Sequence, residues 1–336
     1  MKIRVAIIGA GRMGQRHAEA YKMIKDVELI GFADNITKNA NRLAKKFKVK
    51  SFTINQILSN DTIDAVNVCT PNIDHAKISI KVLNSGKHVL VEKPMAINLA
   101  DCDKMINAAY KNNVKLMVGQ TYRFYPSSIA AKKIIDSGQI GNIGLAQIHG
   151  IDPGFIRGQK KMPQWFKKKN SGGGLLFDMV HMVDLLREWF KSEISQVYVP
   201  SIDKISKNAT AEQMGLVIMK FQNGASASIM AVAPSWGIRD AGIKIIGKMG
   251  ALHVTYGEEV KVGKETWKQY KFQFKAKSAT YEHNLMGFIN ELSEFIKSIK
   301  EDRIPRVSGE DGKKNLAVIL AMYESYRLKK LINLKT

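Results

Sequence analysis

Three short parts of the chain carry residue types that could perform chemistry. Gly9–Gly14 reads Gly-Ala-Gly-Arg-Met-Gly, Lys93 stands within Glu-Lys-Pro, and Asp178 and His181 follow three consecutive glycines. A lysine can polarise the oxygen of an alcohol, and a histidine near neutrality can accept a hydroxyl proton. A glycine-rich turn before a helix can hold a pyrophosphate. Together these residue types favour hydride transfer between a dinucleotide and a small alcohol.

The Gly9–Gly14 segment has the G-x-G-x-x-G spacing of a dinucleotide-binding turn between a predicted strand and a predicted helix. The glycines allow a tight turn and close approach of the backbone to the ligand. Asp34 ends the second predicted strand, where its carboxylate can accept hydrogen bonds from a ribose. Asp34 would repel a 2′-phosphate, which favours NAD, and NADP stays an alternative because Lys38 and Arg12 are near in sequence. A glycine-rich turn without a ligand is the other interpretation.

Two further segments end strands that are predicted to lie in the same sheet. Thr70, Pro71 and Asn72 follow one strand and could border the nicotinamide half of a coenzyme, or could form an ordinary turn. Lys93 ends the next strand, where partial loss of its hydration would help it to polarise a substrate oxygen. A solvated lysine before a turn proline is the simpler alternative.

The helix predicted at Leu175–Phe190 is apolar except for a few polar side chains. Asp178 and His181 are three residues apart and share a face, as do His181 and Asp184. The histidine is suited to take a hydroxyl proton while a carboxylate orients it. A buried structural histidine with one hydrogen bond is the alternative. No third ligand follows nearby, so no metal is predicted.

The first 120 residues alternate short β-rich runs with helical patterns, which is typical of βαβ units on a parallel sheet. Strands are predicted at Ile3–Ile8, Val27–Ala33, Ala65–Cys69, His88–Val91 and Lys115–Val118. Helices between them are predicted at Met13–Met23, Lys38–Phe47, His75–Asn84 and Ala100–Asn112. These elements predict an N-terminal Rossmann domain over residues 1–121.

From about residue 122 the predicted strands follow one another directly. Asn223 and Gly224 predict a tight hairpin between Gln213–Phe221 and Ala225–Ala233, because this dipeptide supplies positive φ angles. A last helix is predicted from Gly309, with Ser308 and Asp311 as a capping box. We therefore expect an α/β chain whose second domain, residues 122–336, has a mostly antiparallel open sheet.

The composition is that of a folded chain with 336 residues, of which 45% are hydrophobic and 24% are charged. The net charge of +22 comes from 41 lysines and 11 arginines that are scattered, which argues against a nucleic-acid surface. The tightest basic cluster, at 157–169, could serve an anionic substrate. No apolar run approaches the length of a membrane span and no export signal is evident. Two cysteines, Cys69 and Cys102, indicate packed thiols in a cytoplasmic protein.

Taken together, the motifs resemble the Gfo/Idh/MocA family, the group of glucose-fructose oxidoreductase and inositol dehydrogenase. The resemblance runs almost from end to end. The matching segments are Gly9–Ala18, Cys69–His75, Gly86–Pro94, Tyr122–Pro126, Ser137–Gly141, Gly172–His181 and Pro305–Gly312. The Glu-Lys-Pro segment and the His-x-x-Asp after the triple glycine are the most specific of these.

The resemblance implies that Lys93 is a catalytic lysine and His181 an acid/base histidine, with Asp178 beside it. Many members place this aspartate four residues before the histidine, whereas the interval here is three. Asp184 fits the trailing aspartate and is expected to be structural. The coenzyme site is expected to use Gly9, Gly11, Arg12, Met13, Gly14, Asp34, Thr70, Pro71, Asn72, His75 and Glu92. The substrate is expected to contact Tyr122, Arg123, His149 and Trp165, and Trp165 could equally be a core aromatic.

These expectations predict an NAD(P)-dependent dehydrogenase, active as a homodimer or homotetramer. Its substrate would be a secondary alcohol of a sugar, an inositol or a sugar derivative, including anionic and nucleotide-linked ones. The alternatives are a non-catalytic, NAD-binding sugar sensor and an NAD-dependent glycosidase of the same family. No nucleic acid or membrane partner is expected.

Overall fold

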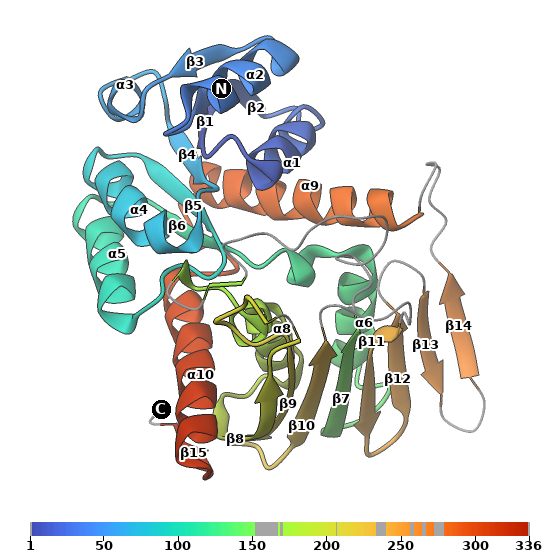
Figure 1. Ribbon diagram of the computed structural model, residues 1–336. Coiled ribbons are helices and arrows are strands. Elements are labelled where there is room, and N and C mark those ends of the chain that lie inside the picture. The colour runs from blue at the N-terminus through green and yellow to red at the C-terminus, as the bar shows by residue number, and fades with distance from the viewer. Residues whose placement is uncertain are drawn as a thin grey trace. The chain divides into compact units, whose positions relative to one another are not determined.

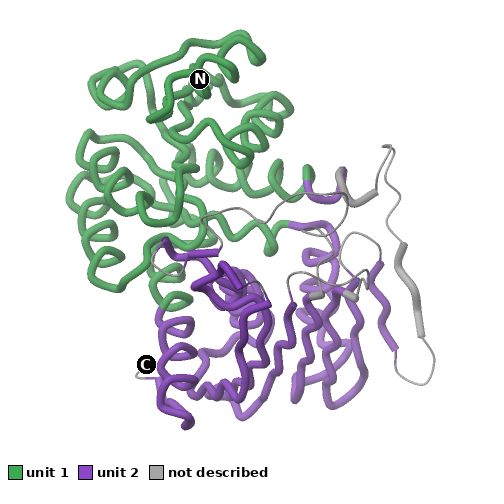
Figure 2. Tube along the Cα trace, in the orientation of Figure 1, with its two compact units in different colours: residues 1–124, 285–316 green, residues 125–284, 317–336 purple. Residues whose placement is uncertain are grey.

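The computed structural model describes residues 2–151, 167–168, 171–205, 207–232, 240–255, 259–263, 267–271 and 279–334. The chain divides into two compact units, which Figure 2 shows in different colours. Unit 1 contains residues 1–124 and 285–316, and unit 2 contains residues 125–284 and 317–336. The sequence places 285–316 in the second domain, whereas contacts group this segment with the N-terminal residues. The functional domain boundary expected after residue 121 stays a prediction.

Unit 1 contains a six-stranded sheet in the order β3-β2-β1-β4-β5-β6, counted over the described residues (Figure 1). All of its paired strands are parallel, as predicted. The strands are β1 (Ile3–Ile8), β2 (Val27–Ala33), β3 (Lys50–Phe52), β4 (Ala65–Val68), β5 (His88–Glu92) and β6 (Leu116–Gly119). The helices between them are α1 (Arg12–Tyr21), α2 (Thr37–Phe47), α3 (Ile54–Leu58), η1 (Asn72–Asp74), α4 (His75–Asn84) and α5 (Leu99–Lys111), and η2 (Thr121–Phe124) follows β6.

The strand order brings the glycine turn to a position where ligands bind in sheets of this kind. The centre of β1 is fully buried because helices cover both faces of such a sheet, so its side chains are nearly all apolar. The order reverses between β1 and β4, and the loops after these strands leave the same carboxyl edge. The turn after β1 and the Thr-Pro-Asn loop after β4 therefore lie at the switch point.

The sequence did not predict β3 or α3. The strand β3 has three residues, none of them fully buried, so it lacks a hydrophobic pattern. The helix α3 begins with a reciprocal capping box between Thr53 and Gln56, with N···O distances of 3.2 and 2.8 Å. The Thr-x-x-Gln spacing is a known sequence signature of a helix N-terminus, so the start of α3 could have been predicted from it.

Unit 2 contains a nine-stranded sheet in the order β14-β13-β12-β11-β7-β10-β9-β8-β15 over the residues that the structure describes. Only β7 and β10 pair in parallel there, so the mostly antiparallel sheet is confirmed. The strands are β7 (Ile143–Ile151), β8 (Ile194–Asp203), β9 (Met214–Phe221), β10 (Ser226–Val232), β11 (Asp240–Gly247), β12 (Ala251–Thr255), β13 (Glu259–Gly263), β14 (Trp267–Lys271) and β15 (Ile332–Asn333). The helices of this half of the chain are α6 (Pro126–Asp136), α7 (Leu175–Asp178), α8 (Val180–Phe190), α9 (Ala279–Lys300) and α10 (Gly309–Leu328).

Over the described residues of unit 2, one face of this sheet packs against a core and the other is exposed. Along β9 buried and exposed side chains alternate, as expected for a strand with one face against a core. On the covered side, α7 contacts β9, and Ser325 of α10 accepts a hydrogen bond from Val199 N of β8 at 3.0 Å. The other face is apolar in part and exposed.

Two local features differ from the predictions. In the hairpin between β9 and β10 only Gly224 has a positive φ, +87°, while the Asn223 side chain accepts a hydrogen bond from Ala225 N at 3.1 Å. The predicted helix over 175–190 is interrupted at Met179, which divides it into α7 and α8.

The capping box at Ser308 and Asp311 is confirmed, because each residue's backbone N–H donates to the other's side chain at 3.1–3.2 Å.

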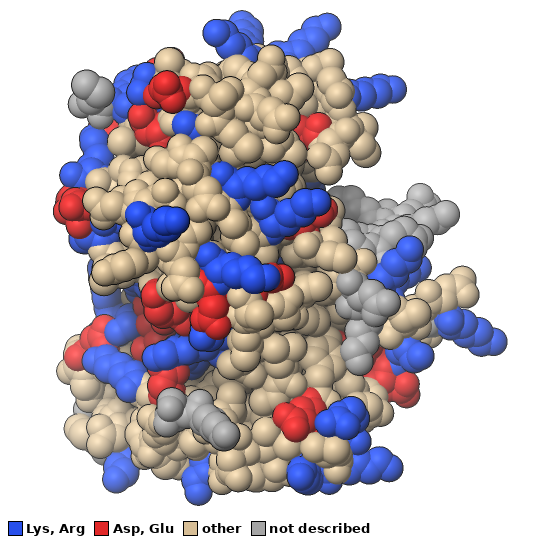
Figure 3. Space-filling view, turned by 90° about the vertical axis from the view of Figure 1, so that its left-hand side faces the viewer, with Lys and Arg blue, Asp and Glu red and all other residues tan. Residues whose placement is uncertain are grey.

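The positive charge is dispersed on the face that Figure 3 shows, with acidic side chains between the basic ones. This distribution agrees with a compositional bias. In the described part of the chain, no helix combines the length and the apolar character that crossing a bilayer requires.

Candidate active site

The glycine turn after β1 is packed so closely that two of its glycines have no room for a side chain. Gly9 has φ +104°, and a Cβ there would lie 2.5 Å from the Cys69 carbonyl group. A Cβ on Gly14 would lie 2.0 Å from the Gly9 oxygen. Gly11, by contrast, has open space beside it within 4 Å. The turn therefore holds α1 tightly against β1 and leaves its N-terminus accessible to a phosphate.

Asp34 follows β2 and points back to this turn. Its Oδ2 accepts a hydrogen bond from Ala10 N at 2.7 Å, and its Oδ1 accepts one from Ile36 N at 2.8 Å. A carboxylate has about four lone-pair sites, so the two oxygens can still accept ribose hydroxyl groups. Arg12 is exposed and Met13 half-buried at the start of α1. These positions fit the expected dinucleotide site.

The loop after β4 presents a buried hydroxyl group. Thr70 Oγ1 is buried and has no hydrogen-bond partner among the described residues. Pro71 is exposed and Asn72 half-buried in the same loop. Because buried polar groups are usually satisfied, the Thr70 hydroxyl suggests a place for a polar group of a ligand. His75 lies beneath this loop with 1% exposure, so it supports the loop from below.

Glu92 lies in a fully connected polar network in the core of unit 1. Its Oε1 accepts a hydrogen bond from His17 Nε2 at 2.9 Å, and Asn67 Nδ2 donates to the other ring nitrogen at 2.7 Å. Tyr21 donates its hydroxyl to Asn67 Oδ1 at 2.7 Å. The His17 Nε2–H therefore points toward Glu92. Burial raises the pKa of Glu92, but the hydrogen bond and charge of His17, together with the charge of Lys93, outweigh burial, so the pKa lies below its usual value of 4.5.

The network fixes the backbone from which Lys93 extends. Glu92 Oε2 accepts a hydrogen bond from Lys93 N at 3.3 Å, and the Lys93 side chain is half-buried at the carboxyl end of β5. Glu92 is 6% exposed. Glu92 thus contributes to the site by holding Lys93, and direct contact of its carboxylate with a coenzyme is not needed for that role.

In unit 2, Glu212 fixes the start of the segment that carries Asp178 and His181. Leu176 N donates to Glu212 Oε1 at 2.9 Å, and Leu175 N donates to the Glu212 carbonyl oxygen at 3.1 Å. The Tyr323 hydroxyl donates to the same Oε1 at 2.8 Å. Burial raises the pKa of Tyr323, and the adjacent Glu212 carboxylate raises it further.

The contact with Glu212 also explains the last of the three glycines, Gly174. Gly174 has φ +111°, and a Cβ there would lie 2.5 Å from Glu212 Oε1. Only glycine combines this backbone conformation with such a close carboxylate. The carboxylate in turn accepts a hydrogen bond from the Leu176 amide, which has no partner within α7. Neither Glu212 nor Tyr323 was predicted as a site residue, since no local spacing in the sequence links them to the glycines.

The predicted catalytic pair is not on one continuous helix. Asp178 ends α7 and is exposed, whereas His181 lies in the first turn of α8 and is half-buried. The interruption at Met179 between them removes the simple argument from a shared helical face. Asp184 is fully buried, in keeping with a structural role. Lys93 belongs to unit 1 and His181 to unit 2.

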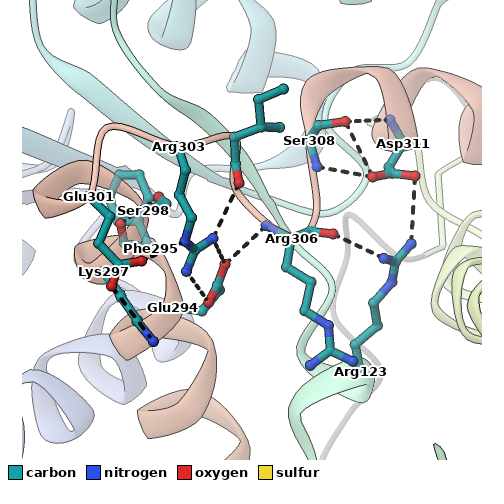
Figure 4. A network of polar contacts seen from close by, with 11 residues as sticks. Arg123, Glu294, Phe295, Lys297, Ser298, Glu301, Arg303, Arg306, Ser308 and Asp311 are labelled. Carbon is teal, nitrogen blue, oxygen red and sulfur yellow. Dashed lines mark hydrogen bonds and ion pairs between the residues drawn. The ribbon is translucent and has the colours of Figure 1, made fainter. Parts of the chain in front are cut away.

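Arg123, predicted to bind substrate, is buried in unit 1 with 6% exposure (Figure 4). It donates to the Arg306 carbonyl oxygen at 3.1 Å and lies 3.8 Å from Asp311 Oδ1. Nearby, Glu294 binds Arg303 and Arg306 N. These contacts attach η2 to the segment before α10, so Arg123 has a structural function in addition to any contact with substrate.

Of the remaining residues predicted to contact substrate, the structure describes Tyr122 and His149 but not Trp165. Tyr122 is half-buried in η2. His149 lies in β7, where alternation puts it on the sheet face opposite to the buried Ile148. Trp165 and most of the basic cluster at 157–169 lie outside the described residues, although Lys167 and Lys168 are described.

Comparison with known proteins decides the family. The model of an oxidoreductase family with an NAD-binding Rossmann fold matches residues 3–120, and the model of its C-terminal alpha/beta domain matches residues 132–334. The chain belongs to the Gfo/Idh/MocA oxidoreductase family. It is thus an oxidoreductase with an NAD-binding Rossmann fold, and the resemblance inferred from the motifs is confirmed.

Several relatives match over nearly the whole chain. Myo-inositol 2-dehydrogenase of Thermotoga maritima is 28% identical and covers 99% of both chains. The NAD(+)-dependent scyllo-inositol 2-dehydrogenase of Bacillus subtilis is 27% identical over 97% of this chain and 94% of that protein. The crystal structure of a putative myo-inositol dehydrogenase from Sinorhizobium meliloti superposes with a TM-score of 0.85 at 26% identity, over 99% of this chain and 100% of the other.

Proposed function

We propose that the protein is an NAD-dependent dehydrogenase that oxidises a ring hydroxyl of an inositol or a closely related polyol. The observation that carries the proposal is the full-length similarity to inositol dehydrogenases, in a chain that holds Lys93 at the carboxyl end of β5 through Glu92. NADP stays the alternative coenzyme, and Asp34 at the end of β2 favours NAD.

In the proposed reaction, Lys93 stabilises the substrate oxygen while His181 takes the hydroxyl proton. A nicotinamide coenzyme held by the Gly9–Gly14 turn and Asp34 would supply the hydride acceptor. The C–H and O–H bonds of the alcohol break and a carbonyl group forms, so two electrons and one proton leave as hydride and the second proton goes to His181. Asp178 is proposed to orient His181, and Tyr122, Arg123, His149 and Trp165 are proposed to contact the polyol.

The test begins with mass spectrometry of any coenzyme retained during purification. NADH formation is then followed with myo-inositol, scyllo-inositol, glucose, glucose 6-phosphate and a sugar nucleotide. Reduction of NAD by an inositol is the expected result. Binding of NAD without reduction by any polyol would favour the sensor, and NAD-dependent cleavage of a glycoside without net reduction would favour the glycosidase. A preference for anionic sugars would support a role for the basic cluster.

The proposal includes a homodimer or homotetramer formed through the exposed sheet face of unit 2. Apolar side chains pair there across neighbouring strands: Met230 with Leu216, Leu145 with Ile246 and Tyr198 with Ile218. All six are at least 36% exposed. Such a contiguous apolar surface is typical of an interface. A cytoplasmic location is also proposed, in keeping with the free, buried thiols of Cys69 and Cys102.

A further inference from the structure

The ring of His75 bridges two loops of unit 1 in an unusual way. Its Nδ1 lies 2.8 Å from the Pro94 carbonyl oxygen, and its Nε2 lies 2.8 Å from the Thr70 carbonyl oxygen. Both partners can only accept hydrogen bonds. A neutral imidazole has one N–H and one lone pair, so it can satisfy only one of them. Only the imidazolium form could donate a hydrogen bond to both carbonyl oxygens.

We propose that His75 is a positioning residue that, when protonated, clamps the Thr70 loop to the Lys93 loop. Thr70 follows β4 and Pro94 follows Lys93, so the clamp joins the loops at the carboxyl ends of neighbouring strands. One joined loop carries the unsatisfied Thr70 hydroxyl, and the other carries the proposed catalytic lysine. The clamp therefore sets the position of Lys93 relative to the coenzyme loop.

The surroundings decide when the clamp is closed. His75 is 1% exposed, and burial lowers its pKa; the two carbonyl acceptors, Glu92 and Asp74 act in the opposite direction without reversing the shift. In the folded protein the His75 pKa lies below its usual value of 6.5, so the ring is protonated mainly at acidic pH. As the pH rises through the lowered pKa, the proton leaves to solvent and one carbonyl contact must lengthen.

The direct test is nuclear magnetic resonance of the ligand-free protein with ¹⁵N-labelled histidine rings. His75→Gln assigns the His75 signals by their disappearance. We expect both ring nitrogens to be protonated at acidic pH, with loss of one proton as the pH rises. The backbone amides of Thr70 and Lys93 should shift with the same midpoint. A single neutral tautomer at every pH at which the protein is folded would overturn the clamp, as would a titration that leaves the Lys93 amide unchanged.

The second test measures NAD affinity by calorimetry, and a dehydrogenase assay only where activity is found. The wild type should bind NAD on the order of tenfold more weakly at pH values above the His75 midpoint. His75→Gln should bind NAD weakly at every pH, because only the nitrogen of its amide can donate a hydrogen bond and it therefore cannot join both carbonyl groups. The control is His88→Gln at the opposite end of β5, where the ring accepts a hydrogen bond from Lys115 N. Identical pH profiles for His75→Gln and the wild type would contradict the inference.

The inference rests on the proposed function only for the kinetic role of Lys93. The titration of the ligand-free protein separates the two, because a clamp that titrates without any dehydrogenase activity would leave the clamp intact and remove the function. Dehydrogenase activity in a protein whose His75 stays neutral would support the function and overturn the clamp.

Discussion

Lys93 is distinguished from the other lysines of the chain by the buried network that fixes its backbone. The chain has 41 lysines, and most need no explanation beyond solubility. Lys93 differs because the residue before it lies in a buried network that reaches His17, Asn67 and Tyr21. Its side chain leaves the carboxyl end of β5 from a fixed backbone.

Replacement of Lys93 by alanine should lower kcat by about two to four orders of magnitude, because a group that stabilises the reacting oxygen is lost. NAD affinity should change little. Initial rates with the best substrate of the polyol panel, together with calorimetric NAD binding, measure both quantities. The matched control is Lys81→Ala on the exposed side of α4, which should behave like the wild type. Unchanged turnover in the Lys93 variant would remove the assignment.

Replacement of Glu92 by glutamine should lower the free energy of unfolding at neutral pH by about 1–3 kcal/mol, since an amide N–H₂ would face the Lys93 N–H. The pKa of Glu92 is lowered in the folded state, so its contribution is complete above 4.5 and is lost as the pH falls through the folded value.

Urea denaturation at neutral pH and near pH 4 should therefore show a difference between the two proteins that shrinks with acidification. Glu28→Gln, at an exposed position of β2, is the control. A difference that does not depend on pH would mean that the carboxylate charge contributes nothing.

At the level of elements, the start of α7 is fixed by a residue that is remote in sequence. Glu212 accepts hydrogen bonds from the backbone of α7 and from Tyr323 of α10. Gly174, the last of the three glycines, therefore allows both the turn and the close packing of the backbone against the Glu212 carboxylate.

Replacement of Gly174 by alanine should displace the start of α7, because its Cβ would overlap the Glu212 carboxylate at a φ of +111°. We expect a loss of about 2–4 kcal/mol in stability and at least a tenfold loss in kcat. Denaturant titration and initial rates measure the two effects.

Gly224→Ala is the matched control, since Gly224 also has a positive φ, +87°, but has no atom near its Cβ position. It should lose about 1 kcal/mol in stability and keep its activity. Equal effects of the two substitutions would show that backbone conformation alone matters and that contact with Glu212 does not.

At the scale of the whole molecule, the open sheet of unit 2 leaves apolar side chains in contact with solvent. Strand alternation requires every strand of this sheet to have a second face. In β9 and β10 that face carries Leu216, Ile218 and Met230. The homo-oligomer proposed above would cover this surface with a second copy of the chain.

Replacement of both Leu216 and Met230 by lysine should reduce the mass of the particle by at least half, because two charges per chain would enter an apolar interface. Sedimentation equilibrium measures the mass, and circular dichroism checks the fold. Tyr110→Lys, at an 89% exposed position of α5, should leave the mass unchanged. A monomeric wild type would end this part of the proposal.

Much of the fold follows from local patterns in the sequence. The buried runs of β1 and β2, the glycine turn and the Ser308 capping box are short-range features, and the structure has them where the sequence predicts them. The edge strand β3 escaped prediction because a strand of exposed residues has no hydrophobic period. The prediction of a continuous helix over 175–190 was wrong, because side-chain periodicity does not report the interruption of the helix at Met179.

The sequence by itself determined which chemical groups are available: a dinucleotide turn, a lysine after a strand and a histidine after three glycines. Only the tertiary structure decided what fixes those groups. Glu92 with His17, Glu212 with Gly174, and His75 with two carbonyl oxygens join residues that are distant along the chain or linked only through a folded loop. The physical reason is that hydrogen bonds and steric contacts act over a few ångströms in space, and nothing in residue order records that distance.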